Sequence, residues 1–573
     1  MTNEVQPATA ADAFLATLKT RGVDWIFGNA GTDFAPLIEA VASAEASGAP
    51  MPRAVEVIHE TVAVAMAHGY YLMTGRPQCV MVHVNVGVAN ALMGLINASR
   101  DNVSMLFASG RTPITEHGRV GSRNLPIHWG QEMFDQGGML REFVKWDNEL
   151  RAPEQVVDVV DRALAITNTE PKGPVYLSLP REVLASPLPD DFQFSATPSV
   201  AAATAPAPDP QAINQVVALL SEATQPLIIT SDGGEALFSA LGEVALEFAI
   251  PVVQFWRTRP AIATTHPMYG GEVPAPLLGE ADVVIVLDSL VPWMPDRMTL
   301  RPDANVVTIG PDPLFTDTPV RSFPSHLTIN ATPAAAVGAI GAELRALGHG
   351  EQSETATRRD RLTAELGARR ARELAAGADP GGTPMSPEFM TRTLSDAAGP
   401  DATIVNELGL ATAMLDLTSH DSFLGLAISG GLGWGGGAAV GAKLAGPDRL
   451  VIWATGDGSY VFSNPLAVHH AAASLGLGLL TVVADNRVWN AVRRSTIAVY
   501  PEGRAAAAKT MPLSSLEPTP DYTKFVEAYG GHGEHVTDPD QLGGALDRAI
   551  EIAATGRQAL VSVHVSYPDM ANH

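Results

Sequence analysis

The chain has 573 residues, a length typical of about three or four domains. Lys and Arg number 37 and Asp and Glu 62, so the formal net charge is −25, which argues against nucleic acid or an anionic membrane as a partner, because both bind positively charged surfaces. Hydrophobic residues make up 46% and the mean hydropathy is +0.10, values that exclude a wholly disordered chain and favour a large core.

The first segment, residues 1–188, alternates short apolar runs with stretches of helical period. Its runs include VDWIFGNAG, QCVMVHVNVG, VSMLFASG and PVYLSLP, and VIHETVAVAMAHGYYLMTGRP places Glu60 at the start of a predicted helix. Residues 186–210 are rich in Ala, Pro and Thr without any period, which predicts an extended linker.

Two further segments show the same alternation of apolar runs and helical stretches. Residues 208–345 contain PLIITSDGG, DVVIVLDSL and NVVTIGPDP, and residues 385–573 contain TIVNELG, RLVIWATGDG and GLLTVVADN. Between them, TRRDRLTAELGARRARELAAG predicts a charged helix that GADPGGTPMSP ends. Most of the apolar runs end in Gly, Asp or Asn, which is typical of parallel sheets covered on both faces. The sequence therefore predicts an α/β fold of three doubly wound parallel-sheet domains, with ligands beyond the carboxyl ends of the strands.

The number of cysteines and the first ten residues indicate the cellular compartment of the protein. Cys79 is the only cysteine, which excludes an intrachain disulfide framework and cysteine-rich metal sites. Residues 1–10 contain no basic region followed by an apolar run, and no run of about 18 uninterrupted apolar residues occurs anywhere. We therefore expect a cytoplasmic protein without a secretory signal or membrane span.

The third segment carries two polar strand ends. RLVIWAT predicts a strand ending at Gly456, Asp457 and Gly458, and LLTVVA predicts the next strand, which ends at Asp485 and Asn486. Because a right-handed crossover brings consecutive parallel strands close together, Asp457 and Asn486 are expected at the same sheet edge. Carboxylate and amide oxygens are hard ligands suited to Mg²⁺ or Ca²⁺, and the glycines let a diphosphate approach the backbone. An ordinary strand-end turn is the alternative.

This arrangement resembles the cofactor motif of thiamine diphosphate-dependent enzymes, in the group of acetolactate synthase and benzoylformate decarboxylase. Members of that family usually have Asn-Asn where this chain has Asp485 and Asn486. The resemblance implies that thiamine diphosphate binds through Mg²⁺. It implies Asp457, Asn486 and the backbone carbonyl of Val488 as metal ligands, and places Gly456, Gly458 and Ser459 in the cofactor site.

The stretch SGGLGWGGGAAVGAKLAG, residues 429–446, precedes that strand. It contains a formal GxGxxG pattern, but the middle is Leu-Trp and the expected acidic residue does not follow on a strand end, so a dinucleotide site is the weaker interpretation. By resemblance this is the family's GGLG stretch, which implies that the carbonyl of Gly430 contacts the aminopyrimidine and that Leu432 supports the bent cofactor. The alternative for Leu432 is a core leucine.

The first segment resembles the family at four positions. Glu60 stands at the glutamate that hydrogen-bonds the aminopyrimidine nitrogen; the alternative is a helix-start Glu that serves its own backbone amides. His83 matches an acid–base histidine of benzoylformate decarboxylase, with a core histidine as the alternative, and Thr32 matches the active-site serine of that enzyme. Asn90 also matches the family. Residues 85–87, Asn-Val-Gly, stand where most relatives have a Gly-Pro-Gly turn.

The resemblance extends over essentially the whole chain. It implies a pyrimidine-binding domain at residues 1–188, a central domain at 208–345 and a diphosphate-binding domain at 385–573. It also implies a homodimer or homotetramer with active sites between subunits. Acetolactate synthases carry FAD in the central domain, but no specific FAD signature is found here. His266 falls at a further family position, where a structural role is at least as well supported.

The implied activity is that of a thiamine diphosphate- and Mg²⁺-dependent lyase or carboligase acting on a 2-oxo acid, with Glu60, His83 and Thr32 as catalytic residues. The substrate would lose CO₂, and its acyl unit could pass to a second carbonyl. The alternatives are an acetolactate synthase-like transferase, cleavage of a diketone or 2-hydroxy ketone without decarboxylation, and a nucleotide-linked oxidoreductase. The expected pocket-lining residues are Thr32, His83, His128, Trp434 and Trp489.

Overall fold

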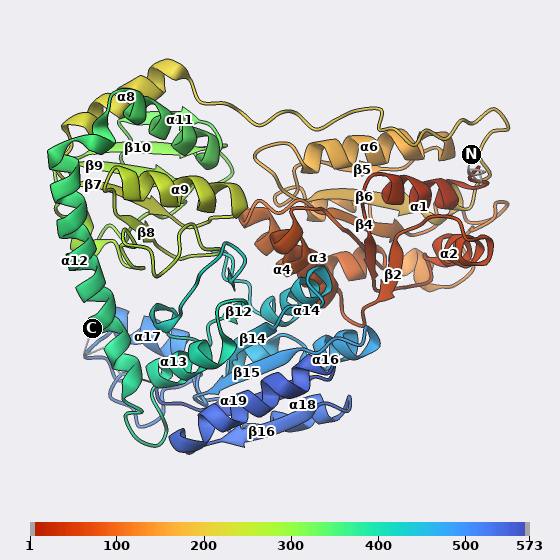
Figure 1. Cartoon of the computed structure of the whole chain (residues 1–573). Coiled ribbons are helices and arrows are strands. Elements are labelled where there is room, and N and C mark those ends of the chain that lie inside the picture. Colours follow the sequence, from red (N-terminus) through yellow and green to blue (C-terminus); the bar gives the residue numbers. More distant parts are fainter. Residues whose placement is uncertain (1–5, 568–573) are drawn as a thin grey trace. The chain divides into compact units, whose positions relative to one another are not determined.

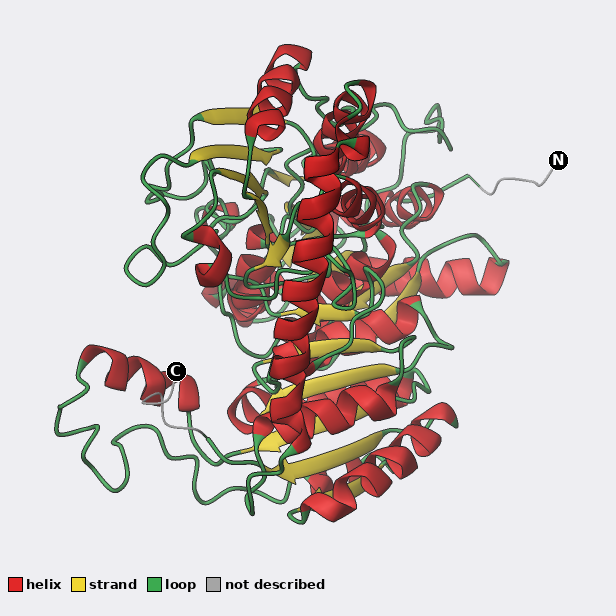
Figure 2. Cartoon of the chain, turned by 60° about the vertical axis from the view of Figure 1, so that its left-hand side comes forward, coloured by secondary structure: helices red, strands yellow, loops and turns green. Residues whose placement is uncertain are grey.

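The computed structural model describes residues 6–567, and its strands form three parallel β-sheets with helices between most successive strands (Figures 1 and 2). The predicted α/β fold with three parallel sheets is confirmed. Residues 1–5 and 568–573 lie outside the described residues. They include half of the segment, residues 1–10, that is expected to lack a secretory signal. Within residues 6–567 no helix is both long and apolar enough to cross a bilayer.

Contacts divide the chain into two compact units. The first contains residues up to 204 together with 426–448 and 460–479, and the second contains residues 205–425, 449–459 and those from 480 onward. The expected domain limits follow the three sheets instead, and they stay a prediction.

The first sheet has the strand order β2-β1-β3-β4-β6-β5. Its strands are β1 (Trp25–Gly28), β2 (Arg53–Glu56), β3 (Cys79–Val82), β4 (Leu106–Arg111), β5 (Asp147–Glu149) and β6 (Val175–Pro180). The helices of this region are α1 (Ala10–Thr20), α2 (Ala35–Ser47), α3 (Glu60–Thr74), α4 (Val84–Arg100), α5 (Ile127–Gly130), α6 (Val156–Thr167) and α7 (Arg181–Leu184). Because β1 pairs with both β2 and β3, the segments that follow β1 and β3 leave the sheet next to each other.

Local chemistry sets several of these boundaries. α1 begins with a capping box between Thr9 and Asp12, and α3 ends at Gly75, whose φ is +66°. α4 begins at Val84, so residues 85–87, expected in a turn, form its first helical turn. Val84 itself is buried and has a φ of +33°, so regular helical backbone begins after it.

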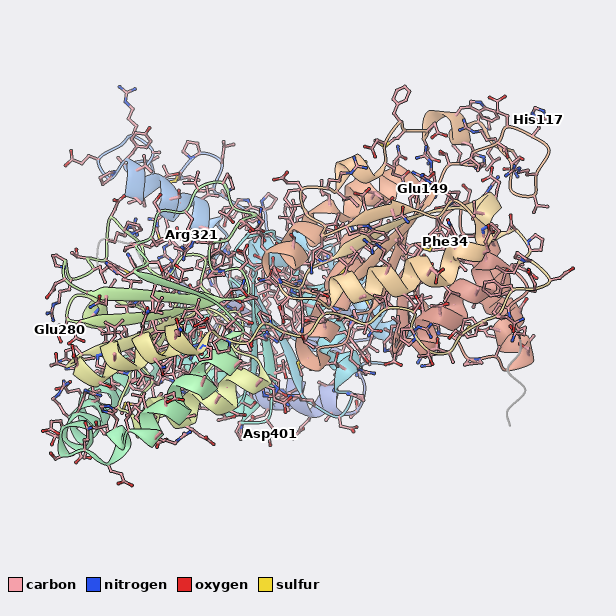
Figure 3. The ribbon with its side chains drawn as sticks, turned by 90° about the horizontal axis from the view of Figure 1, so that it is seen from above. Phe34, His117, Glu149, Glu280, Arg321 and Asp401 are labelled. Atoms are coloured by element: carbon pink, nitrogen blue, oxygen red, sulfur yellow. The ribbon has the colours of Figure 1, made fainter. Side chains whose placement is uncertain are left out.

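The core of the first sheet includes Phe34, labelled in Figure 3, and Cys79. Cys79 is buried, and burial raises the pKa of its thiol to about 12. The linker that follows has no helix or strand over residues 188–209. Its first part is held by Arg21, which donates to the carbonyls of Ser195, Ala196 and Thr197.

The central sheet has the order β11-β10-β9-β7-β8. Its strands are β7 (Pro226–Thr230), β8 (Val252–Gln254), β9 (Val283–Leu287), β10 (Asn305–Gly310) and β11 (Leu327–Asn330). Its helices are α8 (Pro210–Glu222), α9 (Glu235–Glu247), α10 (Ala275–Leu278), α11 (Pro333–Ala346) and α12 (Ser353–Ala375). α12 is the predicted charged helix, and its buried Leu362 and Leu366 join the central core, so this helix is part of a packed layer.

The third sheet has the order β13-β12-β14-β15-β17-β16. Its strands are β12 (Thr403–Glu407), β13 (Phe423–Gly425), β14 (Val451–Gly456), β15 (Leu480–Asp485), β16 (His532–Val536) and β17 (Ala559–His564). The helices of this part of the chain are α13 (Pro387–Ala398), α14 (Gly435–Ala445), α15 (Asp457–Phe462), α16 (Pro465–Ser474), α17 (Asn490–Val499), α18 (Thr523–Glu527) and α19 (Pro539–Ala554). β14 and β15 are neighbours with Gly456 opposite Ala484, so the two polar strand ends share one sheet edge, as the sequence predicts.

Candidate active site

Asp457 is held by backbone on both sides of its carboxylate. It follows the last residue of β14 and opens α15, and it is 2% exposed. Its Oδ1 accepts from the N–H of Gly458 at 2.8 Å, and its Oδ2 accepts from the N–H of Arg487 at 2.5 Å. The left-handed φ of Arg487, +62°, accompanies this second bond. The loop after β15 therefore fixes the orientation of the carboxylate.

A second buried carboxylate lies close to Asp457. Asp485 ends β15, is 3% exposed, and its Oδ1 is a buried atom with no hydrogen-bond partner among the described residues. Burial and then the negative charge of Asp485 raise the pKa of Asp457 to about 7. Burial and then the charges of Asp457 and Asp485 raise the pKa of Tyr522. Arg487 Nε lies 3.9 Å from Asp485 Oδ2, and it is a single cation beside two buried carboxylates, an arrangement that is costly. This donor set therefore fits a bound cation, and the contribution of Asp485 was missed at the sequence level.

The other proposed ligands lie in the loop after β15. Asn486 Oδ1 accepts from the N–H of Val488 at 3.0 Å, and the carbonyl of Val488 accepts from the N–H of Asn490 at 2.8 Å. Each of these oxygens has a second lone pair for a metal. No group of three or more His, Cys, Asp or Glu side chains suited to a metal occurs within residues 6–567. A cation here would take further oxygens from amide, carbonyl, water or phosphate.

The glycine that follows Asp457 is required by the packing around it. A Cβ on Gly458 would lie 2.5 Å from the ring of Trp489, so this position requires glycine. Ser459, one residue on, is 4% exposed. The Trp489 ring thus packs against the end of β14, and its expected place in the substrate pocket stays a prediction.

The loop 429–433 is tied to α4 by one buried asparagine. Asn97 Nδ2 donates to the carbonyl of Gly431 at 2.8 Å, and its Oδ1 accepts from the N–H of Gly431 at 3.1 Å and from Ser429 Oγ at 2.7 Å. Gly430 has a φ of +66°, which favours glycine, and Leu432 is partly exposed. Leu432 is therefore available to a ligand, and Asn97 was missed because nothing in its local sequence marks it.

Two glycines later in this stretch, Gly437 and Gly441, allow close helix packing. α14 packs closely on α3: a Cβ on Gly437 would lie 2.6 Å from the Cβ of Ala65, and one on Gly441 would lie 2.0 Å from the carbonyl oxygen of Met66. Trp434 is 1% exposed, with its ring centroid 5.4 Å from that of His68. The expectation that Trp434 lines the substrate pocket is therefore wrong, because the close approach of the two helices buries it.

Glu60 is the first residue of α3 and is 9% exposed. Its Oε2 accepts from Asn90 Nδ2 at 2.9 Å, and Thr61 Oγ1 donates to the Asn90 carbonyl at 3.0 Å. The side chain that caps α3 is His59, whose Nδ1 accepts from the N–H of Thr61. Glu60 is thus bonded to α4, while another residue performs the helix-start role considered for it.

His83 lies between β3 and α4 with 17% of its side chain exposed. Its Nδ1 contacts Oδ1 of the buried Asp33 at short range, and its Nε2 lies 3.2 Å from Nε2 of Gln131. Asp33, in the turn after β1, was not identified from the sequence. A histidine with one nitrogen on a buried carboxylate and a partly exposed ring is suited to proton transfer.

Thr32 and His128 form a neighbouring pair. Thr32 is exposed and its Oγ1 lies 3.4 Å from His128 Nε2, while His128 Nδ1 accepts from the N–H of Asn124. Burial, followed by the charges of Arg181 and Arg123, lowers the pKa of His128. A neutral His128 therefore donates from Nε2 to the Thr32 hydroxyl.

Two further histidines have structural partners. His266 Nδ1 accepts from the N–H of Met268 at 3.1 Å, and burial lowers its pKa. His469 is fully buried and its Nε2 lies 2.8 Å from the Tyr460 hydroxyl.

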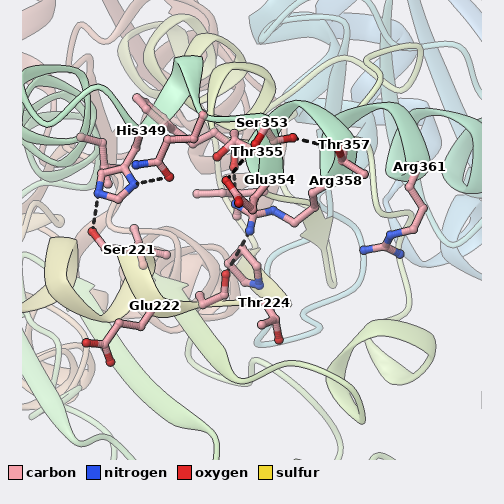
Figure 4. A pocket seen from close by; sticks show the side chains of 17 residues that line it. Ser221, Glu222, Thr224, His349, Ser353, Glu354, Thr355, Thr357, Arg358 and Arg361 are labelled. Carbon is pink, nitrogen blue, oxygen red and sulfur yellow. Dashed lines mark hydrogen bonds between the residues drawn. The ribbon is translucent and has the colours of Figure 1, made fainter.

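A separate hollow of about 650 Å³ lies in the central region, between the ends of α8 and α11 and the start of α12 (Figure 4). Arg358 donates there to three backbone carbonyls, and Ser221 bonds to His349. This hollow borders the beginning of β7, whereas ligands of open parallel sheets bind beyond the carboxyl ends of strands. It is therefore not assigned to the active site.

Models of known protein families match an N-terminal and a C-terminal region of the chain. The model for the N-terminal TPP-binding domain of thiamine pyrophosphate enzymes matches residues 8–139, and that for the C-terminal TPP-binding domain matches residues 408–563. The chain belongs to the thiamine pyrophosphate enzyme family. The first match contains Thr32, Glu60, His83 and Asn90, and the second contains all residues assigned above to the diphosphate and metal.

Known members of the thiamine pyrophosphate enzyme family resemble the chain over nearly its full length. Sulfoacetaldehyde acetyltransferase of Rhodobacter capsulatus is 25% identical over 97% of this chain and 94% of its own. A probable acetolactate synthase of Mycobacterium bovis is 27% identical over 91% of each chain. Benzoylformate decarboxylase of Pseudomonas aeruginosa is 25% identical over 97% of this chain and 98% of its own. The expected resemblance is thus confirmed.

The fold agrees with a solved structure of the same class. The thiamine diphosphate-dependent 4-hydroxybenzoylformate decarboxylase of Rhodococcus jostii RHA1 has a TM-score of 0.77 at 22% identity, covering 98% of this chain and all of that one. Relatives of this thiamine pyrophosphate enzyme thus include an acetyltransferase and a decarboxylase. The alternative of a nucleotide-linked oxidoreductase is not supported, because the GxGxxG stretch falls within the TPP-binding match.

Proposed function

We propose that this chain is a thiamine diphosphate- and Mg²⁺-dependent decarboxylase of a 2-oxo acid that releases an aldehyde. The observation that carries the proposal is His83, a partly exposed histidine held by Asp33 in the same matched domain as Glu60. A decarboxylase needs such a group, because a proton must be delivered after CO₂ departs. Thiamine diphosphate, when bound, would supply a nucleophilic carbon for the substrate carbonyl and a cationic ring to take up the electron pair that CO₂ leaves.

The chain's own residues would act in two sets. Glu60 would hydrogen-bond a cofactor ring nitrogen, with Asn90 orienting its carboxylate at 2.9 Å, and Leu432 would support the cofactor. His83 would exchange a proton with the substrate, and the exposed Thr32 hydroxyl would orient the substrate's carboxylate or carbonyl.

The second set would hold the diphosphate. Asp457, Asn486 and the carbonyl of Val488 would bind Mg²⁺, and residues 456, 458 and 459 would lie beside the diphosphate. Support for a cation comes from the two buried carboxylates and from the raised pKa of Asp457. Mg²⁺ is favoured because all the donors are hard oxygens and a phosphate can complete the shell.

Acyl transfer is the second candidate. It is favoured by two relatives over more than nine-tenths of the chain, one named as an acetyltransferase and one as a probable acetolactate synthase. In that reaction the acyl unit would pass to a second carbonyl or another acceptor. Cleavage of a diketone or 2-hydroxy ketone without decarboxylation is a third outcome that the test below includes.

The test is CO₂ release from a panel of 2-oxo acids that includes pyruvate and benzoylformate, with and without thiamine diphosphate and Mg²⁺. We expect CO₂ that depends on both cofactors and an aldehyde in equal amount. A 2-hydroxy ketone formed when acceptor aldehyde is added would move the assignment to a carboligase. Absence of CO₂ in protein that binds the cofactor would overturn the decarboxylase, and diketones would then be assayed.

The proposal includes a homodimer or homotetramer with active sites between subunits. Complementation tests it: Glu60→Gln and Asp457→Ala subunits are each inactive, but a mixed dimer would contain one site with both residues native. We expect about a quarter of the native activity from an equimolar mixture that has exchanged subunits. No recovery would overturn the shared site.

Two further parts of the proposal concern the chain as a whole. We propose domain limits at residues 1–188, 208–345 and 385–573, and a cytoplasmic location, which the single cysteine and acidic composition favour. Limited proteolysis that cuts between residues 189 and 207 would support the first limit.

A further inference from the structure

The contact between Asp33 and His83 joins two chain segments 50 residues apart. Asp33 lies in the turn between β1 and α2 and is 2% exposed, and His83 follows β3. Because β1 and β3 are adjacent, both residues lie at the carboxyl edge of the first sheet. The Asp33 carboxylate is buried and contacts the partly exposed imidazole, so it interacts with the imidazole and not with solvent.

Two glycines make room for this pair. A Cβ on Gly31 would lie 2.1 Å from Nδ1 of His83, and a Cβ on Gly110 would lie 1.7 Å from Oδ2 of Asp33. Neither glycine has a left-handed φ, so the backbone conformation is not what requires them. Their absent side chains leave the space that the imidazole and the carboxylate fill.

The second carboxylate oxygen of Asp33 supports a strained turn. Val84 has a φ of +33°, a conformation that β-branched residues rarely adopt, and its N–H donates to Asp33 Oδ2 at 3.2 Å. Val84 directly follows His83. Asp33 thus holds both the ring of His83 and the backbone that orients it.

The hydrogen-bond pattern fixes which nitrogen of His83 is available. The carboxylate of Asp33 can only accept, so Nδ1 of His83 carries a proton. In the neutral ring Nε2 is then the acceptor, and it lies 3.2 Å from the amide nitrogen of Gln131, which can donate to it. Gln131 Oε1 is buried and has no hydrogen-bond partner among the described residues.

We propose that Asp33 is a positioning residue that holds His83 as the Nδ1–H tautomer, so that Nε2 is the atom that exchanges a proton with substrate. This inference rests on the proposed function. The proton moves from Nε2 of the doubly protonated ring to the substrate carbon that has lost CO₂, and the N–H electron pair stays on Nε2. Asp33 meanwhile balances the positive charge of the ring, and Gln131 holds Nε2 between turnovers.

Asp33→Asn disturbs this arrangement with little change in size. If the asparagine oxygen accepts from Val84 N–H, its amide faces Nδ1 and forces the proton onto Nε2. If the oxygen faces Nδ1 instead, the amide opposes the Val84 N–H. Either orientation loses one of the two bonds that Asp33 makes.

The test is a double-mutant cycle of Asp33→Asn and His83→Gln, measured as kcat and KM with the best 2-oxo acid. We expect each single variant to lower kcat by about a hundredfold or more, with KM and thiamine diphosphate affinity near native. The double variant should be no slower than His83→Gln alone, because Asp33 acts through His83. The matched control is Asp24→Asn in the same sheet region, whose carboxylate pairs with Lys19 and Arg76, and it should keep native kcat.

Additive losses in the cycle would overturn the proposal, because they would mean that Asp33 only shapes the turn. Native kcat in Asp33→Asn would overturn it as well. If Asp33→Asn does not fold, the ¹⁵N NMR spectrum of histidine-labelled native enzyme tests the proposal instead. The His83 signals are assigned by their loss in His83→Gln, and we expect them to show a protonated Nδ1. A neutral ring protonated at Nε2 would refute the proposal. Failure of the proposed function would be seen separately, as absence of CO₂ from the native enzyme.

Discussion

The backbone N–H of Arg487 donates to Oδ2 of Asp457 at 2.5 Å, and this bond ties the loop after β15 to the end of β14. The same loop contains Asn486 and Val488, so one hydrogen-bonded arrangement includes all the proposed metal ligands. The carboxylate therefore has a double role, because it would bind the cation and also fixes the loop that supplies the other ligands.

Replacing Asp457 with Ala should weaken Mg²⁺-dependent binding of thiamine diphosphate by about a hundredfold or more, because both a metal ligand and the loop anchor are lost. Isothermal titration of the cofactor at fixed Mg²⁺ measures this. The control is Asp396→Asn, on the exposed side of α13, where its partner is Arg392. Equal cofactor affinity in Asp457→Ala and native protein would reject the metal assignment.

Mg²⁺ should stabilise the protein more at pH 8 than at pH 5. The pKa of Asp457 is raised to about 7 in the metal-free fold, whereas an unperturbed Asp has a value of about 3.9. The folded state thus binds this proton more tightly than the unfolded state, and that stabilisation is present below about pH 4 and lost as pH rises through about 7. Mg²⁺ offsets the loss by neutralising the ionised carboxylates.

Thermal unfolding with and without Mg²⁺ and cofactor, from pH 5 to pH 8, measures whether the stabilisation by Mg²⁺ increases with pH. Asp485→Asn removes one of the two like charges, so it should raise the melting temperature of the metal-free protein at pH 8 by a few degrees. The same variant should gain less from Mg²⁺ than the native chain. A Mg²⁺ effect that does not vary with pH would contradict the proposed role of the carboxylate pair.

Glu60→Gln should slow hydrogen–deuterium exchange at the reactive carbon of bound thiamine diphosphate by about a hundredfold or more, because the carboxylate that would polarise the cofactor ring is gone. Asn90 can still bond to the glutamine, so cofactor affinity should change little. Quenched-flow exchange followed by NMR measures the rate. Glu39→Gln on the exposed face of α2 is the control, and an unchanged rate in Glu60→Gln would remove Glu60 from this role.

Gly441→Ala should destabilise the fold by about 1–3 kcal/mol, since its new Cβ would lie 2.0 Å from a backbone oxygen of α3. Gly367→Ala in α12 is the matched control, because nothing lies within 4 Å of a Cβ there. The control should be neutral or more stable, as alanine favours helices over glycine by about 1 kcal/mol. Denaturant unfolding of both variants compares them, and equal stabilities would argue against the tight packing of α3 on α14.

The sequence by itself determined the α/β class and the shared edge of Asp457 and Asn486. Both follow from short-range order, because buried parallel strands are continuous apolar runs whose carboxyl ends meet at one edge. The charged helix α12 was also predicted, but its packing against the central core was not, since only Leu362 and Leu366 mark its apolar stripe.

The contacts that orient the candidate site were decided by tertiary structure. Asp33 meets His83 because β1 pairs with β3 while β2 lies on the outer side, an order that no local pattern encodes. Asn97 reaches Gly431 across more than 300 residues, and Trp434 is buried because α3 and α14 pack with glycine between them. Hydrophobic periodicity specifies which face of an element is buried, whereas the neighbour that covers that face is chosen by shape and packing across the whole chain.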